Sequence, residues 1–108
     1  MVEDQVDRFF EVLADPTRRQ VVQLLGEGPQ RAGQLAVATG SSSPAMSRHL
    51  RILLQAGLVA DERVADDARV RLFRLNPEPV VAVQAWLDQV QAHWREQLGA
   101  FKRHVEKS

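Results

Sequence analysis

The sequence predicts a mainly α (α+β) fold, in which four helices are followed by a β-hairpin and a long final helix. Apolar residues recur at helical spacing in five segments that Gly and Pro separate, and one stretch alternates apolar and polar residues as strands do. The chain has 108 residues, of which 44% are hydrophobic and 26% are charged, as is typical of an ordinary globular domain. We therefore expect residues 1–108 to form one domain.

The first predicted helix covers residues 3–14, and Asp15 followed by Pro16 begins the second. Asp is a favoured N-cap, and Pro fits the first helical position because its missing N–H needs no partner there. We expect the second helix over residues 16–25, with Gly26 as its C-terminal stop. The apolar positions of these two helices are Val6, Phe9, Phe10, Leu13, Val21, Val22, Leu24 and Leu25.

A short helix over residues 31–39 ends at Gly40, and Ser43 with Pro44 repeats the start signal for a fourth helix over 44–56. In the short helix Leu35 and either Ala36 or Ala38 should face inward. The inward positions of the fourth helix are Met46, Leu50, Leu53, Leu54 and Gly57. Its outward positions are Ala45, Arg48, His49 and Ile52, with Ser47 and Arg51 beside them.

Residues 58–60 and 70–75 alternate in β fashion around a polar turn at 65–68, which predicts a hairpin. Four arginines lie along it, namely Arg63, Arg69, Arg71 and Arg74. Two prolines at residues 76–79 then break the chain before the final helix.

The final predicted helix covers about 26 residues from Val80 to Val105, or roughly 39 Å at 1.5 Å per residue. Apolar residues follow one side of it throughout, and Trp86 widens that stripe. A domain of this size cannot easily cover such a rod, so we expect a second copy across a two-fold axis to pair with it. The predicted dimer interface comprises Phe9, Phe10, Leu87, Val90, Trp94, Leu98 and Phe101.

The formal net charge is zero, from 14 basic and 14 acidic residues, but these charges are unevenly placed. Residues 1–28 carry six acids and three bases, whereas residues 29–56 carry three arginines and no acid. Between Glu27 and Asp61 lie 33 residues without a carboxylate. An anionic partner could therefore lie against this stretch.

The order of the elements is that of a winged helix-turn-helix, in which the fourth helix would enter a DNA groove. Serines near a helix N-terminus and arginines suit base edges and phosphates. We expect Ser43 and Arg48 to contact bases, and the wing arginines to contact DNA or else to pair with wing carboxylates. The predicted DNA-binding residues are Arg31, Ser42, Ser43, Ser47, Arg48, Arg51, Arg63, Arg69 and Arg71.

Three motifs resemble the ArsR/SmtB family of bacterial transcriptional repressors: LADPTRR at residues 13–19, SRHL at 47–50 and AGLV at 56–59. The resemblance covers nearly the whole chain. It implies a homodimer, paired through the first and last helices, that binds an inverted-repeat operator on double-stranded DNA. It also implies repression of transcription until an effector, which the sequence does not identify, releases the protein.

The metal sites of that family are incomplete in this sequence. The third-helix cysteine box would align near residues 31–33, where no thiol is present, and the last helix has no Asp-x-His pair. The remaining weak candidate ligands are Asp88, His93, Glu96 and His104. We expect no cofactor and no metal sensing, and a zinc- or nickel-type sensor with a degenerate last-helix site remains the alternative.

Other classes of function are less well supported. The absence of cysteine excludes thiol chemistry, and Ser47 and His49 diverge on their helix, so we expect no enzyme. No export signal or long apolar run is visible, which favours a cytoplasmic protein without a membrane contact. A winged helix that binds another protein remains an alternative, as does an effector pocket lined by Trp86, Trp94 and Phe101. We expect His49 to pack beneath its helix.

Overall fold

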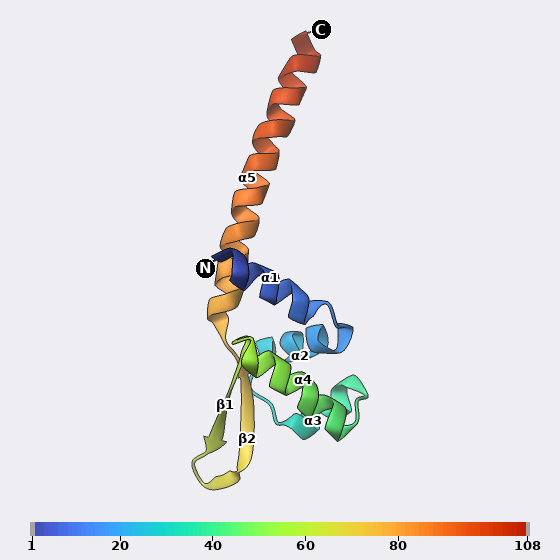
Figure 1. Cartoon of the computed structure of the whole chain (residues 1–108), viewed down its shortest axis with the longest axis vertical. Coiled ribbons are helices and arrows are strands. Elements are labelled where there is room, and N and C mark those ends of the chain that lie inside the picture. The colour runs from blue at the N-terminus through green and yellow to red at the C-terminus, as the bar shows by residue number, and fades with distance from the viewer. Residues whose placement is uncertain (1, 108) are drawn as a thin grey trace.

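The computed structural model describes residues 2–107, with side chains from residue 4 onward. The elements occur in the order that the sequence predicts, and Figure 1 shows the helices α1 to α4 grouped at one end of α5. Their bounds are α1 Val2–Leu13, α2 Pro16–Glu27, α3 Ala32–Thr39, α4 Ser43–Gln55, β1 Val59–Val64, β2 Asp67–Leu75 and α5 Pro77–Lys107.

The ends of α2 and α4 differ from the sequence prediction. Gly26 lies inside α2, and Gly28 ends the helix with φ 155° and ψ 165°, a backbone region that only glycine adopts readily. An internal glycine costs about 1 kcal/mol, which the burial of the adjacent Leu25 outweighs. The N-cap of α4 is Ser42, whose hydroxyl accepts the Ala45 N–H at 3.2 Å, rather than the predicted Ser43.

Helix α5 is longer than expected, with 31 residues beginning at Pro77 rather than at Val80. The first turn of a helix leaves its N–H groups without intrahelical partners, so Pro77 and Pro79 fit there without losing a bond. The prolines that predicted a break therefore begin the helix.

The hairpin pairs β1 with β2 in antiparallel register from Val59↔Leu75 to Val64↔Asp67, with an irregularity at Arg63/Val64. Its turn is shorter than predicted, because Asp67 already belongs to β2. A single antiparallel bridge also joins Gln30 to Phe73, through N–H to O distances of 3.0 and 2.8 Å. This bridge attaches the α2–α3 connection to the hairpin.

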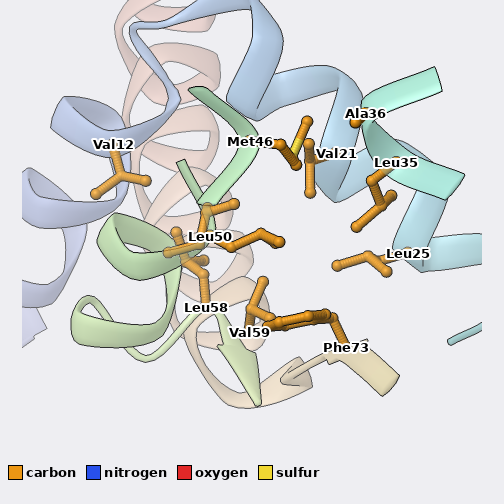
Figure 2. Packing of buried hydrophobic residues seen from close by; sticks show 11 residues of the cluster. Val12, Val21, Leu25, Leu35, Ala36, Met46, Leu50, Leu58, Val59 and Phe73 are labelled. Atoms are coloured by element: carbon orange, nitrogen blue, oxygen red, sulfur yellow. The ribbon is translucent and has the colours of Figure 1, made fainter. Parts of the chain in front are cut away.

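The core lies where α2, α3 and α4 meet the base of the hairpin, as Figure 2 shows. Most predicted core positions on α2, α3 and α4 are buried, with Ala36 inward and Ala38 exposed, whereas Val22, Leu24 and Leu54 are only partly buried against the core. Val12, which the sequence pattern did not single out, is only 1% exposed. The buried cluster comprises Val12, Val21, Leu25, Leu35, Ala36, Met46, Leu50, Leu53, Leu58, Val59 and Phe73.

Helix α5 projects away from this core as a rod, so that the molecule measures 70 × 26 × 23 Å (Figure 1). Near its start α5 packs on α1, where the rings of Phe10 and Trp86 lie 5.9 Å apart, edge to face. Further along, Trp94, Leu98 and Phe101 are each about two-thirds exposed, at 63%, 67% and 66%. None of the helices in residues 2–107 is long and apolar enough to cross a membrane.

Candidate nucleic-acid interface

Helix α4 presents a polar face over its first two turns. Met46, Leu50 and Leu53 bury one side of the helix in the core, which leaves the other side outward. The exposed polar residues are Ser42, Ser43, Ser47, Arg48 and Arg51. Of the four positions predicted to face outward, Arg48 is exposed, whereas Ala45, His49 and Ile52 are half-buried, so the exposed side lies closer to Ser47 and Arg51 than the sequence predicts.

A cavity of about 630 Å³ opens between the start of α3, the outer side of α4 and β2. It brings together five of the nine predicted DNA-binding residues, although these are up to 40 positions apart in the sequence. These five are Arg31, Ser47, Arg51, Arg69 and Arg71. The apolar part of the lining comes from Ala32, Leu50, Leu54, Val70 and Phe73.

The bridge between Gln30 and Phe73 explains why Arg31 reaches this cavity. Gln30 is held beside β2 by two backbone hydrogen bonds, and its side chain also donates to the Leu24 carbonyl at 3.2 Å. Arg31 follows immediately and therefore begins α3 next to the base of the hairpin. One isolated bridge has no periodicity, so the sequence pattern could not reveal it.

Two of the wing arginines form ion pairs within the hairpin. The Arg71 guanidinium donates to the Asp61 carboxylate at 2.9 and 2.6 Å and stacks 4.9 Å from the centre of the Phe73 ring. Arg69 pairs with Asp67 at 3.2 Å. For Arg69 and Arg71 the structure therefore agrees with the alternative that the wing arginines pair with wing carboxylates.

The charge of Asp67 is stabilised by its neighbours. Hydrogen bonds from the Arg69 side chain and backbone lower the pKa of the Asp67 carboxyl below its ordinary value, and slight burial opposes this. The charge of Arg31, at the start of α3, lowers the pKa of Asp67 slightly further. The Asp67 carboxylate is therefore ionised at neutral pH.

The other four predicted DNA-binding residues lie outside the cavity. Ser42, Ser43 and Arg48 lie on the exposed N-terminal half of α4, and Arg63 is exposed on β1. None of these four forms an ion pair or side-chain bond to a carboxylate among residues 4–107. The candidate interface thus has two parts, the start of α4 and the arginine-lined cavity beside it.

His49 is half-buried, as expected for a packing residue, but its partner is a side chain rather than the backbone. Its Nδ1 lies 3.4 Å from Arg18 Nη1, and Arg18 Nε donates to the Val12 carbonyl at 2.6 Å. Arg18 therefore connects the end of α1 to the middle of α4. This contact joins two of the three motifs that carried the family resemblance, although the sequence did not predict that they touch.

The weak metal candidates do not gather in the described part of the chain. No three His, Asp or Glu side chains there lie close enough to hold a metal ion. His93 and His104 lie 11 positions apart on one straight helix, which separates them by about 16 Å. Asp88 instead accepts a hydrogen bond from Gln84 at 2.9 Å.

A short helix, a tight turn and an outward-facing polar helix, flanked by a two-stranded hairpin, define the winged helix-turn-helix class of DNA-binding proteins. A family model described as "Bacterial regulatory protein, arsR family" matches residues 15–61. The chain is also 42% identical over 83 residues to the HTH-type transcriptional regulator Rv2034 of Mycobacterium tuberculosis, covering 77% of this chain and 75% of that relative. The chain belongs to the ArsR family.

Two further proteins are similar to this chain. The Transcriptional repressor SdpR of Bacillus subtilis is 40% identical over 58 residues, which cover 54% of this chain and 64% of that protein. A solution structure of the homodimeric winged helix-turn-helix DNA-binding domain of a possible ArsR-family regulator from Mycobacterium bovis aligns with a TM-score of 0.63. That alignment has 30% identity and covers 88% of this chain and 82% of the other.

The comparisons confirm the fold class and the family that the sequence predicts. The family is one of DNA-binding transcriptional regulators rather than enzymes, as the sequence also predicts.

Proposed function

We propose that this chain is a transcriptional repressor that binds an inverted-repeat operator as a homodimer in the cytoplasm, with residues 1–108 acting as one domain. The observation that carries the proposal is the pairing of an exposed polar α4 with an arginine-lined cavity at its side. In this arrangement α4 enters the major groove, and the adjacent DNA backbone passes over the cavity.

The proposed contacts follow from the position of each side chain. Ser43, at the start of α4, and Arg48, on its exposed side outside the cavity, contact base edges, and Ser42 contributes a hydroxyl to a phosphate at the helix N-terminus. Arg31, Ser47 and Arg51 hold phosphates, because they line the cavity rather than the tip of the helix. The wing arginines Arg63, Arg69 and Arg71 reach the backbone or the minor groove of the next half-turn.

The test begins by selecting an operator from a random duplex library with the full chain. Affinity is then measured by fluorescence anisotropy at several salt concentrations. Arg48→Ala should weaken binding by about 10- to 100-fold and relax specificity at one base position, since a bidentate base contact discriminates by roughly 1–3 kcal/mol. Arg51→Ala should weaken binding to all sequences and reduce the salt slope by about 0.9.

Lys107→Ala is the matched control, because it removes one positive charge at the far end of α5 (Figure 1). Its affinity should remain within about twofold of that of the unmodified chain. If Arg48→Ala and Arg51→Ala also leave the affinity for DNA within about twofold, the proposal is contradicted. A failure to enrich any duplex would favour the protein-interaction module, which the zero net charge and the paired wing arginines would then explain.

We further propose that the signal is not a metal bound by this chain. The support is that the candidate ligands of α5 are dispersed along one helix and that cysteine is absent from the sequence. Calorimetric titration of the dimer with zinc, nickel and cobalt should show no binding tighter than about 10 µM. Stoichiometric binding that His93→Ala abolishes would instead indicate a site shared across the dimer.

A further inference from the structure

We propose that the cavity between α3, α4 and β2 also binds a small organic anion with an apolar body, and that this ligand and DNA exclude each other. The competition with DNA rests on the proposed function, whereas the binding of the anion does not. The arguments concern the charge of the cavity, its apolar wall and its position.

The cavity has an excess of positive charge. Arg69 and Arg71 each have a carboxylate partner in the hairpin, but no carboxylate among residues 4–107 lies within ion-pair distance of Arg31 or Arg51. Their own segment of the sequence has no acid from residue 28 to residue 60, and Asp67, whose carboxyl the Arg31 charge influences, is already paired with Arg69. Two guanidinium groups therefore line the cavity without an ion-pair partner, and an anionic group can pair with them.

The apolar wall is the feature that DNA does not require. A phosphodiester backbone is polar and contacts guanidinium and hydroxyl groups at the rim, so it leaves an apolar surface unused. Here the half-buried Ala32, Leu54 and Val70 line the cavity together with the buried Leu50 and Phe73. A ligand with an aromatic or aliphatic body would remove this surface from water.

The dimensions suit a small molecule. The volume of about 630 Å³ lies within the roughly 300–1,000 Å³ that small-molecule sites occupy. A bicyclic aromatic carboxylate is small enough to place its ring against Leu54 and Val70 while its carboxylate reaches Arg31 or Arg51. The chemistry therefore favours a carboxylate, sulfonate or phosphate on an apolar body over a simple inorganic anion.

The position of the cavity makes the ligand a competitor of DNA. Arg31, Ser47 and Arg51 cannot contact a phosphate of the operator and the anion of the ligand at the same time. If binding is exclusive, the apparent affinity for DNA falls by the factor 1 + [L]/Kd, where Kd belongs to the ligand. Ligand at nine times its Kd should therefore weaken DNA binding about tenfold.

The first experiment uses 2-naphthoate as the probe and neutral 2-naphthamide as its uncharged match. Both are titrated into the ¹⁵N-labelled full chain while backbone amide shifts are recorded. We expect 2-naphthoate to shift the amides of Ala32, Ser47 and Val70 saturably, and 2-naphthamide to bind at least about tenfold more weakly. Shifts confined to the exposed apolar stripe of α5, or equal binding of the two probes, would overturn the proposal.

The second experiment fills the cavity without altering its charge. Ala32→Leu places a larger side chain in the apolar wall, and Ala38→Leu adds the same atoms at an exposed position of the same helix. Ala32→Leu should weaken 2-naphthoate binding at least about tenfold and change DNA affinity by less than about threefold. Ala38→Leu should leave both unchanged, and unaltered 2-naphthoate binding by Ala32→Leu would contradict the proposed site.

The third measurement separates the two proposals. Displacement of the selected operator by 2-naphthoate, with Ala32→Leu resistant to it, supports competition. Binding of 2-naphthoate without displacement removes the regulatory part of the inference and leaves the proposed function intact. Failure to bind any duplex refutes the proposed function, while the amide shifts still decide whether the cavity takes an organic anion.

Discussion

At the scale of single residues, Arg18 connects the part of the molecule expected to form the dimer to the part expected to bind DNA. Its Nε donates to the last turn of α1, and its Nη1 faces the ring of His49 on α4 at 3.4 Å. A displacement of α1 would therefore change the position of Arg18 and its contact with α4.

A double-mutant cycle tests this coupling. We expect Arg18→Ala and His49→Ala each to lower the free energy of unfolding by about 1 kcal/mol, because each removes a half-buried hydrogen-bonded group. The double variant should lose about 0.5–1 kcal/mol less than the sum of the two losses. Urea unfolding at one fixed protein concentration gives the free energy of unfolding of the unmodified chain, the two single variants and the double variant. If the two losses add exactly, the contact between Arg18 and His49 does not contribute to stability.

Asp15 provides a second prediction at this scale. Burial alone raises the pKa of its carboxyl, but hydrogen bonds from the Arg18 and Thr17 N–H groups, with the charges of His49 and Arg18, leave the pKa below its ordinary value of 3.8. The ionised cap therefore stabilises the fold above that pH, and this stabilisation is lost as pH falls through the folded-state pKa.

Asp15→Ala should cost about 0.5–2 kcal/mol at pH 7, the usual cost of losing an N-cap. Asp15→Asn keeps an acceptor oxygen but cannot titrate, so its stability deficit relative to the unmodified chain should shrink as pH falls from 5 to 2.5. Chemical denaturation across this pH range gives the free energy of unfolding of the unmodified chain and of Asp15→Asn as a function of pH. A deficit that stays constant would show that the charge of Asp15 plays no part.

At the scale of elements, the wing contains its own counter-charges. Asp61 holds Arg71 through two short hydrogen bonds, and Asp67 holds Arg69, so both arginines are partly neutralised before any ligand arrives. Such exposed pairs contribute little to the stability of the fold. Their effect is on binding, because an arginine already paired with a carboxylate is less available to a phosphate.

Releasing Arg71 should therefore strengthen DNA binding. We expect Asp61→Asn to lower the Kd for the selected operator by about three- to tenfold at 0.1 M salt and to raise the salt slope by about 0.9, as one more phosphate contact would. Glu62→Gln is the matched control, since it removes one negative charge from the neighbouring position without freeing Arg71. Equal effects of the two substitutions would show that only net charge matters.

The elements also show what sequence reasoning could and could not predict. Periodicity identified every helix and both strands, because it reports which side is buried, and Met46, Leu50 and Leu53 occupy the predicted side of α4. Boundaries were less accurate where one residue type has two roles. The sequence predicts a break at Pro77, which instead begins a helix, and a stop at Gly26, whereas Gly28 ends α2.

Helical periodicity also made part of the candidate site predictable. The residues of α4 share one helix face, so their spacing placed them together. The grouping of Arg31 with Arg69 and Arg71 depends on the isolated Gln30–Phe73 bridge, and the contact of Arg18 with His49 joins residues 31 positions apart. Neither contact has a repeating pattern, so only the three-dimensional structure reveals them.

At the scale of the whole molecule, the C-terminal half of α5 has no cover within one chain. Trp94, Leu98 and Phe101 remain about two-thirds exposed although the spacing of these residues is that of a buried helix face. A contiguous exposed apolar stripe on a rod is typical of an interface between chains. The predicted pairing through α1 and α5 would cover it with the same stripe of a second copy.

A charge placed in this stripe should separate the dimer without unfolding the chain. Trp94→Glu leaves the core of one chain intact, because the Trp94 side chain is 63% exposed there, but it would bury an unpaired carboxylate in the dimer. We expect the dimer dissociation constant to rise at least about 100-fold by sedimentation equilibrium. Affinity for a full operator should fall, because each monomer binds only one half-site.

Ala92→Glu is the matched control, since Ala92 is exposed on nearly the opposite side of α5, about 160° around the helix from Trp94. It should remain dimeric and bind DNA as the unmodified chain does. Circular dichroism of both variants distinguishes a folded monomer from an unfolded chain. If Trp94→Glu and the corresponding Phe101→Glu both sediment as stable dimers, the stripe on α5 is not the dimer interface, and another surface must pair the two copies.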